Sequence, residues 1–389
     1  MKHAEQIRLI ELLLQRLDAG TNVDAGAFVH NPNEVYRSPE IAAREWDTFF
    51  RNHTQLIGLS GDLPESGSFL TRSDFGVPVL ATRDAQGRFR AFVNVCRHRG
   101  VVVEGEPHGT RSRFVCPFHG WTYDGEGALV AVPKESHFGT VDKSCLGLTP
   151  LPAEERHGFL WVHPQPDGVL DLDTQLGDLN EEFETWNFGR YRAMGSDTYE
   201  KRMNWKLGND TFGETYHFKV LHRDTLAQDF HGNVQTYDIF GRNHRMGLCF
   251  KAIEELRREP RENWHISRAA LPVYYLFPNV QLNVLPGNLA LVRFYPDRAD
   301  PARSIARVNF YASPEAIEMG GEDIRNIPLG FGEIIRDEDF EIAALSQIGA
   351  DCGVHDYVVF GRNEPALHHY HNTFREALGM PLLERLDEA

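Results

Sequence analysis

Two short motifs, each pairing a cysteine with a histidine, are the part of this sequence with the clearest chemistry. Cys96 and His98 stand one residue apart, and Cys116 and His119 follow after seventeen further residues. Thiolates suit an iron that stays ferric and neutral imidazoles suit the iron that is reduced. The set therefore fits a [2Fe-2S] cluster with two Cys on one iron and two His on the other. Since imidazole ligands raise the reduction potential, the pattern indicates a protein that receives electrons.

A structural zinc site is the alternative for the same four residues. Zinc sites of this composition usually present Cys-x₂₋₄-Cys followed by His-x₃₋₅-His, whereas each half here mixes one Cys with one His. The first spacing is also only one residue. These differences, together with the Arg and Gly residues after the first half, favour the iron-sulfur interpretation.

A second candidate site lies at His217 and His222, which are five residues apart. Ligands on one face of a regular helix would be three or four residues apart, so this spacing requires the helix to end or bulge between them. A ferrous oxygenase site needs two His and one carboxylate on one face, with positions left for O₂. Taken alone, the His pair is weak evidence of a metal site.

The two motifs together resemble a known family. Residues 94–100 and 116–123 resemble the Rieske domain, and Glu214-x₂-His217-x₄-His222 resembles the Asp/Glu-x₂-His-x₄-His motif of the Rieske non-haem iron oxygenases. These are the large (α) subunits of ring-hydroxylating oxygenases. The resemblance covers about residues 35–380. It implies a [2Fe-2S] cluster on Cys96, His98, Cys116 and His119, and a mononuclear Fe(II) on His217 and His222.

The resemblance also implies a distant third iron ligand. Residues 336–347 resemble the late acidic segment of the family, in which Gln347 follows the ligand Asp by eight residues, and this indicates Asp339. Asp337 and Glu338 are the competing acids.

Two further acids are candidate catalytic residues. In the family the acid at the position of Glu214 bridges an iron-site His and a cluster His across a subunit interface and carries the electron. His119 is favoured over His98 as its partner. Asp210 lies seven residues before His217, and Thr211 stands where the family motif has Asn.

The resemblance implies that the chain uses O₂ and electrons from NAD(P)H, delivered by a separate reductase with or without a ferredoxin. The expected reaction is hydroxylation, by cis-dihydroxylation or monooxygenation, of an aromatic or other largely apolar small molecule. Oxidative N- or O-demethylation and quaternary-ammonium monooxygenation are the alternatives. A homotrimer is expected, with or without a separate β subunit. An electron-transfer protein would lack the second site, and a zinc-binding protein would be colourless.

The elements that must position these residues follow from the hydrophobic pattern. Apolar residues at helical spacing predict a helix that ends at Ala19-Gly20, and a second helix is expected over 39–53. From about residue 55 to 163 short β-rich runs alternate with turns, and the cluster motif falls on two loops among them. Listed in order, the later elements are a helix at 173–188, a strand at 192–203, a helix at 205–220, strands at 233–240, 242–250, 272–285, 289–297 and 304–312, and helices at 331–350 and 363–378.

This order predicts an α+β protein: an all-β Rieske domain at 51–165, inserted between N-terminal helices at 1–50 and the catalytic iron domain at 166–389. The family implies that the catalytic domain has an antiparallel sheet gripped by helices, of the START-like kind. The formal charge of −16 makes nucleic acid an improbable partner. No apolar run is long enough to span a membrane, and the N-terminus lacks a signal-peptide core, so a cytoplasmic protein is expected. Five cysteines do not make a disulfide scaffold, and Cys145, Cys249 and Cys352 are expected to be buried.

Overall fold

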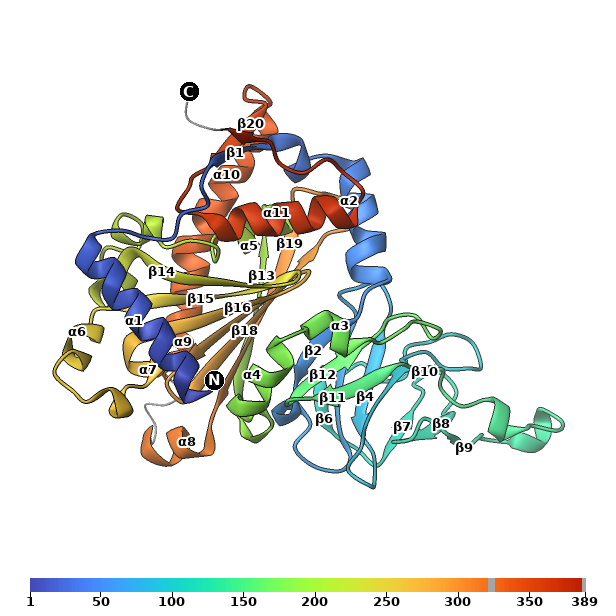
Figure 1. The fold of residues 1–389 in the computed structure, drawn as a ribbon. Coiled ribbons are helices and arrows are strands. Elements are labelled where there is room, and N and C mark those ends of the chain that lie inside the picture. The colour runs from blue at the N-terminus through green and yellow to red at the C-terminus, as the bar shows by residue number, and fades with distance from the viewer. Residues whose placement is uncertain (321–325, 387–389) are drawn as a thin grey trace. The chain divides into compact units, whose positions relative to one another are not determined.

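The structure is a computed structural model that describes residues 1–320 and 326–386, with the backbone alone described at 326–329. The chain forms two compact units. We call the first the helix–sheet unit, made of Met1–Trp46, Leu172–Trp186 and Met194–Ala389. The second, the β unit, comprises Asp47–Asp171 and Asn187–Ala193. Figure 1 shows the ribbon of both.

The β unit consists of three small sheets joined by loops. Their strand orders are β10-β5-β4-β3-β6, β11-β12-β2 and β7-β8-β9, and all the pairings described are antiparallel. The strands are β2 (Gln55–Leu59), β3 (Ser68–Arg72), β4 (Val79–Arg83), β5 (Phe89–Val93), β6 (His108–Thr110), β7 (Arg113–Val115), β8 (Thr122–Asp124), β9 (Leu129–Ala131), β10 (Pro150–Leu151), β11 (Ala153–Arg156) and β12 (Phe159–Val162). The predicted all-β character of this segment is therefore confirmed.

The helix–sheet unit is built on a seven-stranded sheet with the order β13-β19-β18-β17-β16-β15-β14. Each pairing from β14 to β19 is antiparallel, which confirms the predicted sheet type. The strands are β13 (Arg192–Lys201), β14 (Phe230–Phe240), β15 (Asn243–Phe250), β16 (Ala270–Leu276), β17 (Val280–Leu285), β18 (Asn288–Pro296) and β19 (Ser304–Ala312). The strand predicted at 272–285 is in fact a hairpin of β16 and β17. Pro278, which has no N–H to donate to a strand ladder, lies in the turn between them.

Helices cover both faces of this sheet (Figure 1). Tyr275 and Gln281 face α11 (Pro365–Ala377), where both contact Tyr370. Tyr274 faces the opposite side and contacts Phe183 of α4 (Leu179–Trp186). Since side chains alternate between the faces of a strand, neighbouring residues of β16 serve different layers. The result is the helix-flanked antiparallel sheet that the sequence predicts.

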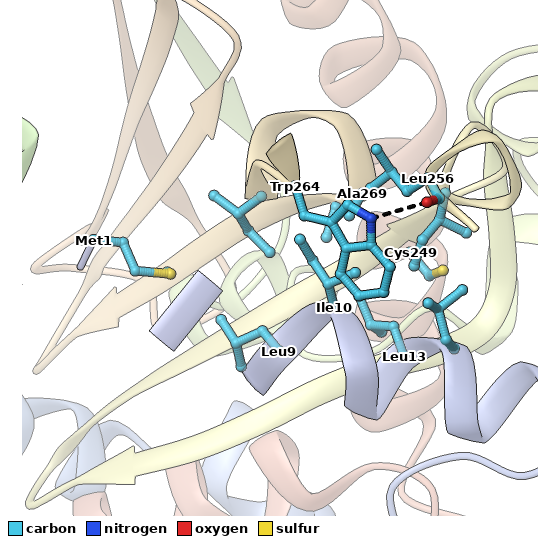
Figure 2. Close-up of a cluster of buried hydrophobic side chains, with 12 residues drawn as sticks. Met1, Leu9, Ile10, Leu13, Cys249, Leu256, Trp264 and Ala269 are labelled. Atoms are coloured by element: carbon cyan, nitrogen blue, oxygen red, sulfur yellow. Dashed lines mark hydrogen bonds between the residues drawn. The ribbon is translucent and has the colours of Figure 1, made fainter. Parts of the chain in front are cut away.

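The α4 face of the sheet also carries the N-terminal helix α1 (His3–Ala19), together with α6 (Ile253–Leu256) and α7 (Ile266–Ala269). Figure 2 shows their shared apolar core, in which Leu9, Ile10 and Leu13 of α1 lie beside Trp264. The Trp264 indole N–H donates to the Leu256 carbonyl at 2.9 Å, so this buried polar atom is paired. Gly20 ends α1 in the left-handed conformation, with φ of 63°, as its predicted boundary requires.

The remaining elements complete the helix–sheet unit. Its helices are α2 (Pro39–Glu45), α3 (Leu172–Leu176), α5 (Trp205–Asp210), α8 (Pro314–Gly320), α9 (Asn326–Ile334) and α10 (Phe340–Cys352), and a small sheet has the order β20-β1-β21 with strands Tyr357–Phe360, Phe28–Pro32 and Arg385–Leu386. Among the described residues, no helix is long and apolar enough to cross a bilayer. Cys249 is buried as predicted, but Cys145 and Cys352 are exposed, so that prediction was wrong for two of the three.

Candidate metal centres

The two cluster loops of the β unit have the same local structure. The Cys96 N–H donates to the Val101 carbonyl, and the Gly100 N–H donates to the Cys96 carbonyl. The second loop repeats both bonds, from Cys116 to Trp121 and from Gly120 to Cys116. Gly100 and Gly120 have φ of 74° and 71°, which only glycine adopts readily, so they close both turns.

This duplicated loop gives the site two chemically different ends. The thiols of Cys96 and Cys116 are buried, each with 3% of the residue exposed. The imidazoles of His98 and His119 lie nearer the surface, with ring centroids 4.6 Å apart. Two buried sulfurs opposite two outward imidazoles fit a cluster with one Cys₂ iron and one His₂ iron.

Two aromatic side chains support the cluster loops. The Tyr123 hydroxyl lies 3.3 Å from Cys96 Sγ and accepts from the Arg97 N–H at 3.0 Å. The Trp121 ring stacks on His98 with centroids 5.0 Å apart and an interplanar angle of 10°. Both residues belong to the motif at 116–123, but the sequence alone gave no reason to assign them these contacts.

The second centre begins where helix α5 stops. The sequence predicts one helix over 205–220, but α5 ends at Asp210 and a separate 3₁₀ turn covers Tyr216–Lys219. Gly213 lies in the break, against α11: a Cβ there would approach Leu367 Cδ2 to 2.6 Å. The predicted single helix is therefore wrong. The 3₁₀ turn ends at Lys219, between His217 and His222, and this end accounts for their five-residue spacing.

Three donors from distant parts of the chain converge at this break. His217 Nε2 and His222 Nε2 are 3.2 Å apart, and they lie 3.6 and 3.3 Å from Asp339 Oδ1. Donors about 2.1 Å from one ion stand about 3 Å apart when they occupy neighbouring octahedral positions. The three therefore fit one facial set around a single metal ion, and they form the one such group among the described residues.

A carboxylate outside this set contacts each imidazole on its other nitrogen. Glu214 lies against His217 Nδ1 and also accepts the backbone N–H of residue 217 at 3.1 Å. Glu338 lies 2.6 Å from His222 Nδ1 and accepts from the Thr225 hydroxyl at 2.9 Å. Such contacts fix the tautomer so that the Nε2 lone pair faces a metal. Sequence reasoning treated Glu338 only as a competing ligand, since its neighbour in space is 116 residues away.

The acids also set the charge of the metal-free site. Burial alone would lower the pKa of His217, but hydrogen bonds to Asp339 and Glu214 outweigh it and raise the pKa to about 9. Burial would raise the pKa of Asp339, yet the two imidazoles hold it below its ordinary value. A metal ion must therefore displace a proton when it binds.

Asp210 belongs to a different network. Its carboxylate accepts from the Tyr36 hydroxyl at 2.8 Å and lies 3.0 Å from His371 Nε2. The structure thus does not bring Asp210 to the three donors. His368 and His369 contact the backbone carbonyls of Gly361 and Gly241.

An apolar pocket of about 70 Å³ opens beside the three donors. Strands β15, β16 and β17 form one wall, and the segment from α9 to the π-helical turn Ile335–Asp339 forms another. Its apolar lining residues are Phe212, Phe218, Leu226, Phe230, Leu248, Leu271, Val273, Leu285, Phe331, Ile334 and Ile335. A metal ion at the three donors would therefore face a largely dry, hydrophobic space.

Comparison with known proteins matches two segments of the chain to family models. Residues 53–146 match the model of the Rieske [2Fe-2S] domain. Residues 188–380 match the model of the ring hydroxylating alpha subunit (catalytic domain).

Curated relatives of this chain carry out different reactions. One is the N,N-dimethyl phenylurea N-demethylase subunit alpha of Sphingobium sp., 28% identical over 60% of this chain and 52% of the relative. Another is the glycine betaine monooxygenase oxygenase subunit of Chromohalobacter salexigens, 29% identical over 50% of this chain and 43% of the relative. The aligned part of the chain spans about half the length of these curated relatives.

Solved structures share the fold at low sequence identity. A quaternary ammonium Rieske monooxygenase aligns with a TM-score of 0.77 and 18% identity, over 91% of this chain and 96% of that one. Naphthalene 1,2-dioxygenase from Rhodococcus sp. aligns with a TM-score of 0.72 and 19% identity, over 96% and 98%. The family expected from the two motifs is thereby confirmed. The chain belongs to the Rieske non-haem iron oxygenases, as a large (α) subunit with a Rieske [2Fe-2S] domain and a non-haem iron catalytic domain.

Proposed function

We propose that this chain is an oxygenase component that uses O₂ and electrons from NAD(P)H to hydroxylate an aromatic or other largely apolar small molecule. One observation carries the proposal: three donors spaced for a single iron, beside an apolar pocket. Cys96, His98, Cys116 and His119 would hold the [2Fe-2S] cluster. His217, His222 and Asp339 would hold Fe(II).

Iron at this site supplies the activation of O₂, and the cluster supplies electrons one at a time. The surrounding residues orient the metal ligands and exclude water from the site. Glu214 and Glu338 hold the imidazoles in the tautomer that offers Nε2 to the metal. The aliphatic and phenylalanine walls keep bulk water from the reacting atoms and hold the substrate beside them.

Electrons would come from a reductase, with or without a ferredoxin. Glu214 would carry them to the iron from His119 of a neighbouring subunit in a homotrimer, and a β subunit is compatible with this assembly. Asp210 would not contact the metal; it would act by holding His371 and Tyr36. We also propose domain boundaries at 1–50, 51–165 and 166–389, and a cytoplasmic location.

Oxidative demethylation is the second candidate reaction. It is favoured by the relative named as a phenylurea N-demethylase, because an N-methylated aryl urea is a neutral, largely apolar substrate that suits a hydrophobic pocket. Quaternary ammonium oxidation is the remaining alternative, from the glycine betaine relative.

The test begins with the metal content of the purified protein. About three irons and two acid-labile sulfides per chain are expected, with a rhombic EPR signal of low average g after dithionite reduction. Asp339→Asn should lose one iron and keep the EPR signal. Zinc in place of iron, or no signal, would contradict the proposal.

Activity should then be measured with a reductase, NADH and a small panel of substrates. Naphthalene, N,N-dimethyl-N′-phenylurea and glycine betaine represent the three reaction classes. Product formation coupled to NADH oxidation, lost in Asp339→Asn, is the expected result for one of the first two.

A further inference from the structure

A hollow of about 460 Å³ lies between the end of α1 and the start of β14 in the helix–sheet unit. We call it the cationic groove, because Arg16, Lys219, His231 and Lys251 line it and no Asp or Glu is among its described lining residues. Its volume is typical of sites for small molecules. We propose that the cationic groove binds the anionic group of a small molecule, a carboxylate or a phosphate.

Two lysines of the groove have no acid to neutralise them. Within the described part of the chain, Lys219 and Lys251 form no ion pair, and Lys134 is the other lysine without one. The remaining four of the seven lysines pair with carboxylates, namely Lys2, Lys143, Lys201 and Lys206. Acids outnumber cations in the chain, with 56 Asp and Glu against 40 Lys and Arg, yet no acid pairs with these two lysines. A hollow lined by one sign of charge attracts the opposite charge.

Neutral acceptors hold two of the cations in place. Lys251 Nζ donates to the Ala227 carbonyl at 2.6 Å, and the Arg16 guanidinium donates to the carbonyl of Gln235. A carbonyl oxygen restricts the side chain without cancelling its positive charge. Because these side chains are already ordered, an anion that binds them loses less of its affinity to the cost of fixing them.

Both lysines act on one ring of the groove, the imidazole of His231. Burial lowers the pKa of His231, and the ammonium groups of Lys251 and Lys219 lower it further, against the opposing charge of Glu254. Lys219 also packs along Gly232, where a Cβ would come within 3.1 Å of its Cγ. The two positive charges therefore converge on the same part of the groove, where one anionic group can face both.

The acids that act on the groove from outside are committed to arginines. Glu254 acts electrostatically on the groove histidine, and Asp238 acts on the groove arginine. Glu254 pairs with Arg257 at 2.6 Å, and Asp238 pairs with Arg245 at 2.9 Å. Their charges are therefore largely balanced, and the groove keeps its positive character.

Phe230 separates the cationic groove from the iron-site pocket. It is the one described residue that lines both, and only 7% of it is exposed. Its ring centroid is 5.5 Å from that of Phe218, which lies 5.3 Å from the His222 imidazole. An anion in the groove therefore lies beside the wall of the iron site.

The anionic group can come from two sources, the polar end of the substrate or a free anion. The first source rests on the proposed function. It requires Phe230 to move, because the iron-site pocket of about 70 Å³ is smaller than the cavity of about 150 Å³ that holds benzene. A free anion needs no such movement.

Equilibrium dialysis against the oxidised holoenzyme, without reductase, measures binding in the absence of turnover. The probes 4-phenylbutyrate and 4-phenylbutyramide differ in charge, and acetate lacks the apolar tail. At low salt, 4-phenylbutyrate should bind about tenfold more tightly than its amide. This preference should shrink as the salt rises from about 10 mM to about 1 M, because the Debye length falls from about 30 Å to about 3 Å.

The tail distinguishes the two sources. If the anion is the end of a substrate, 4-phenylbutyrate should bind more tightly than acetate, and Phe230→Ala should strengthen the binding of 4-phenylbutyrate alone. If the ligand is a free anion, acetate and 4-phenylbutyrate should bind alike, and Phe230→Ala should change neither. Both results support the cationic groove as an anion site.

The double variant Lys219→Gln/Lys251→Gln should bind 4-phenylbutyrate and its amide equally. Lys134→Gln is the matched control, since Lys134 is exposed, forms no ion pair with the described residues and lies outside the groove. It should keep the wild-type preference. The inference is overturned if the wild type does not prefer the carboxylate, if the double variant keeps the preference, or if Lys134→Gln loses it as well. The iron content of the same sample tests the proposed function separately, because the groove residues are not iron ligands.

Discussion

Glu338 contacts the His222 imidazole of the candidate iron site from outside the ligand set. It stands next to the expected ligand Asp339, and sequence reasoning considered it only as a competing ligand. The structure places its carboxylate 2.6 Å from Nδ1 of His222, which is itself only 1% exposed. Because no water can replace this contact at a buried ring, Glu338 fixes the direction of the His222 lone pair.

Glu338→Gln should therefore weaken metal binding about 10- to 100-fold without removing a ligand. Titration of the metal-depleted protein with Co(II), followed by its visible absorption, measures the affinity without any need for activity. Asp337→Asn is the control, since Asp337 is exposed and pairs with Arg336. Equal affinities of the two variants would remove Glu338 from the metal site.

The raised pKa of His217 predicts how metal binding depends on pH. Below pH 9 the metal-free imidazole is protonated, and a metal ion must displace that proton. Affinity for Co(II) should rise about tenfold per pH unit from pH 6.5 to 8.5 and level off near 9. An affinity that does not change with pH would contradict the raised pKa.

The raised pKa of His217 also makes the stability of the metal-free protein depend on pH. This dependence runs opposite to that of the metal affinity. A pKa raised above the ordinary value of 6.5 adds stability that is fully present below pH 6.5. That contribution is lost as the pH rises through about 9. The metal-free protein should therefore become less stable over the range in which its metal affinity increases.

At the scale of elements, a buried ion pair joins the helices that lead to the iron site. Lys206 at the start of α5 contacts both carboxylate oxygens of Glu45 at the end of α2, at 2.6 and 2.8 Å, and both side chains are almost fully buried. The Trp205 indole N–H donates to the same carboxylate at 2.9 Å. Glu45 therefore fixes where α5 begins, five residues before the break that leads to His217.

Lys206→Met should destabilise the protein by about 3–5 kcal/mol, because it leaves the Glu45 carboxylate buried without a counter-charge. Adding Glu45→Gln removes that charge and keeps an acceptor for Trp205, so the double variant should recover most of the loss. Urea unfolding measures both. If the double variant were no more stable than Lys206→Met, an unpaired charge would not be the cause.

Elements with one clear periodicity could be predicted from the sequence, and elements set by tertiary contacts could not. Helix α1 was predicted to its last residue, since its apolar stripe and Gly20 are local signals. The break after α5 depends on the close approach of Gly213 to α11, some 150 residues later in the chain. The hairpin of β16 and β17 was missed because both strands are almost wholly buried, so apolar residues continue on both sides of the short turn at Pro278-Asn279.

In the candidate metal sites, too, local sequence motifs were predictable and contacts between distant residues were not. The four cluster residues stand in two short motifs whose spacing suggested their role, and the two iron histidines stand in a third motif that became informative through the family resemblance. The contact of Glu338 with His222 joins residues that are far apart in the sequence, and no local pattern indicates it. Asp339 was accessible only through the family resemblance.

At the scale of the whole molecule, the proposed electron path between subunits makes a prediction that single variants cannot test. Cys96→Ser should leave a chain with an intact iron site and no cluster, and Asp339→Asn should leave the cluster and no iron. Each homotrimer should be inactive alone. In mixed trimers, a cluster-bearing chain can serve the iron of its Cys96→Ser neighbour, and in an equal mixture about a quarter of the junctions have this arrangement.

Co-expression of the two variants with different affinity tags, followed by purification through both tags, isolates these mixed trimers. Because every mixed trimer has one such junction out of three, activity near a third of the wild-type value per chain is expected if electrons cross between subunits. A chain carrying both substitutions, mixed with Cys96→Ser chains, is the control and should stay inactive, since it offers no cluster. If the mixed trimers are also inactive while each retains its own metal centre, electrons pass within one chain. In that case Glu214 links the two centres of a single subunit, and the trimer has no part in the reaction.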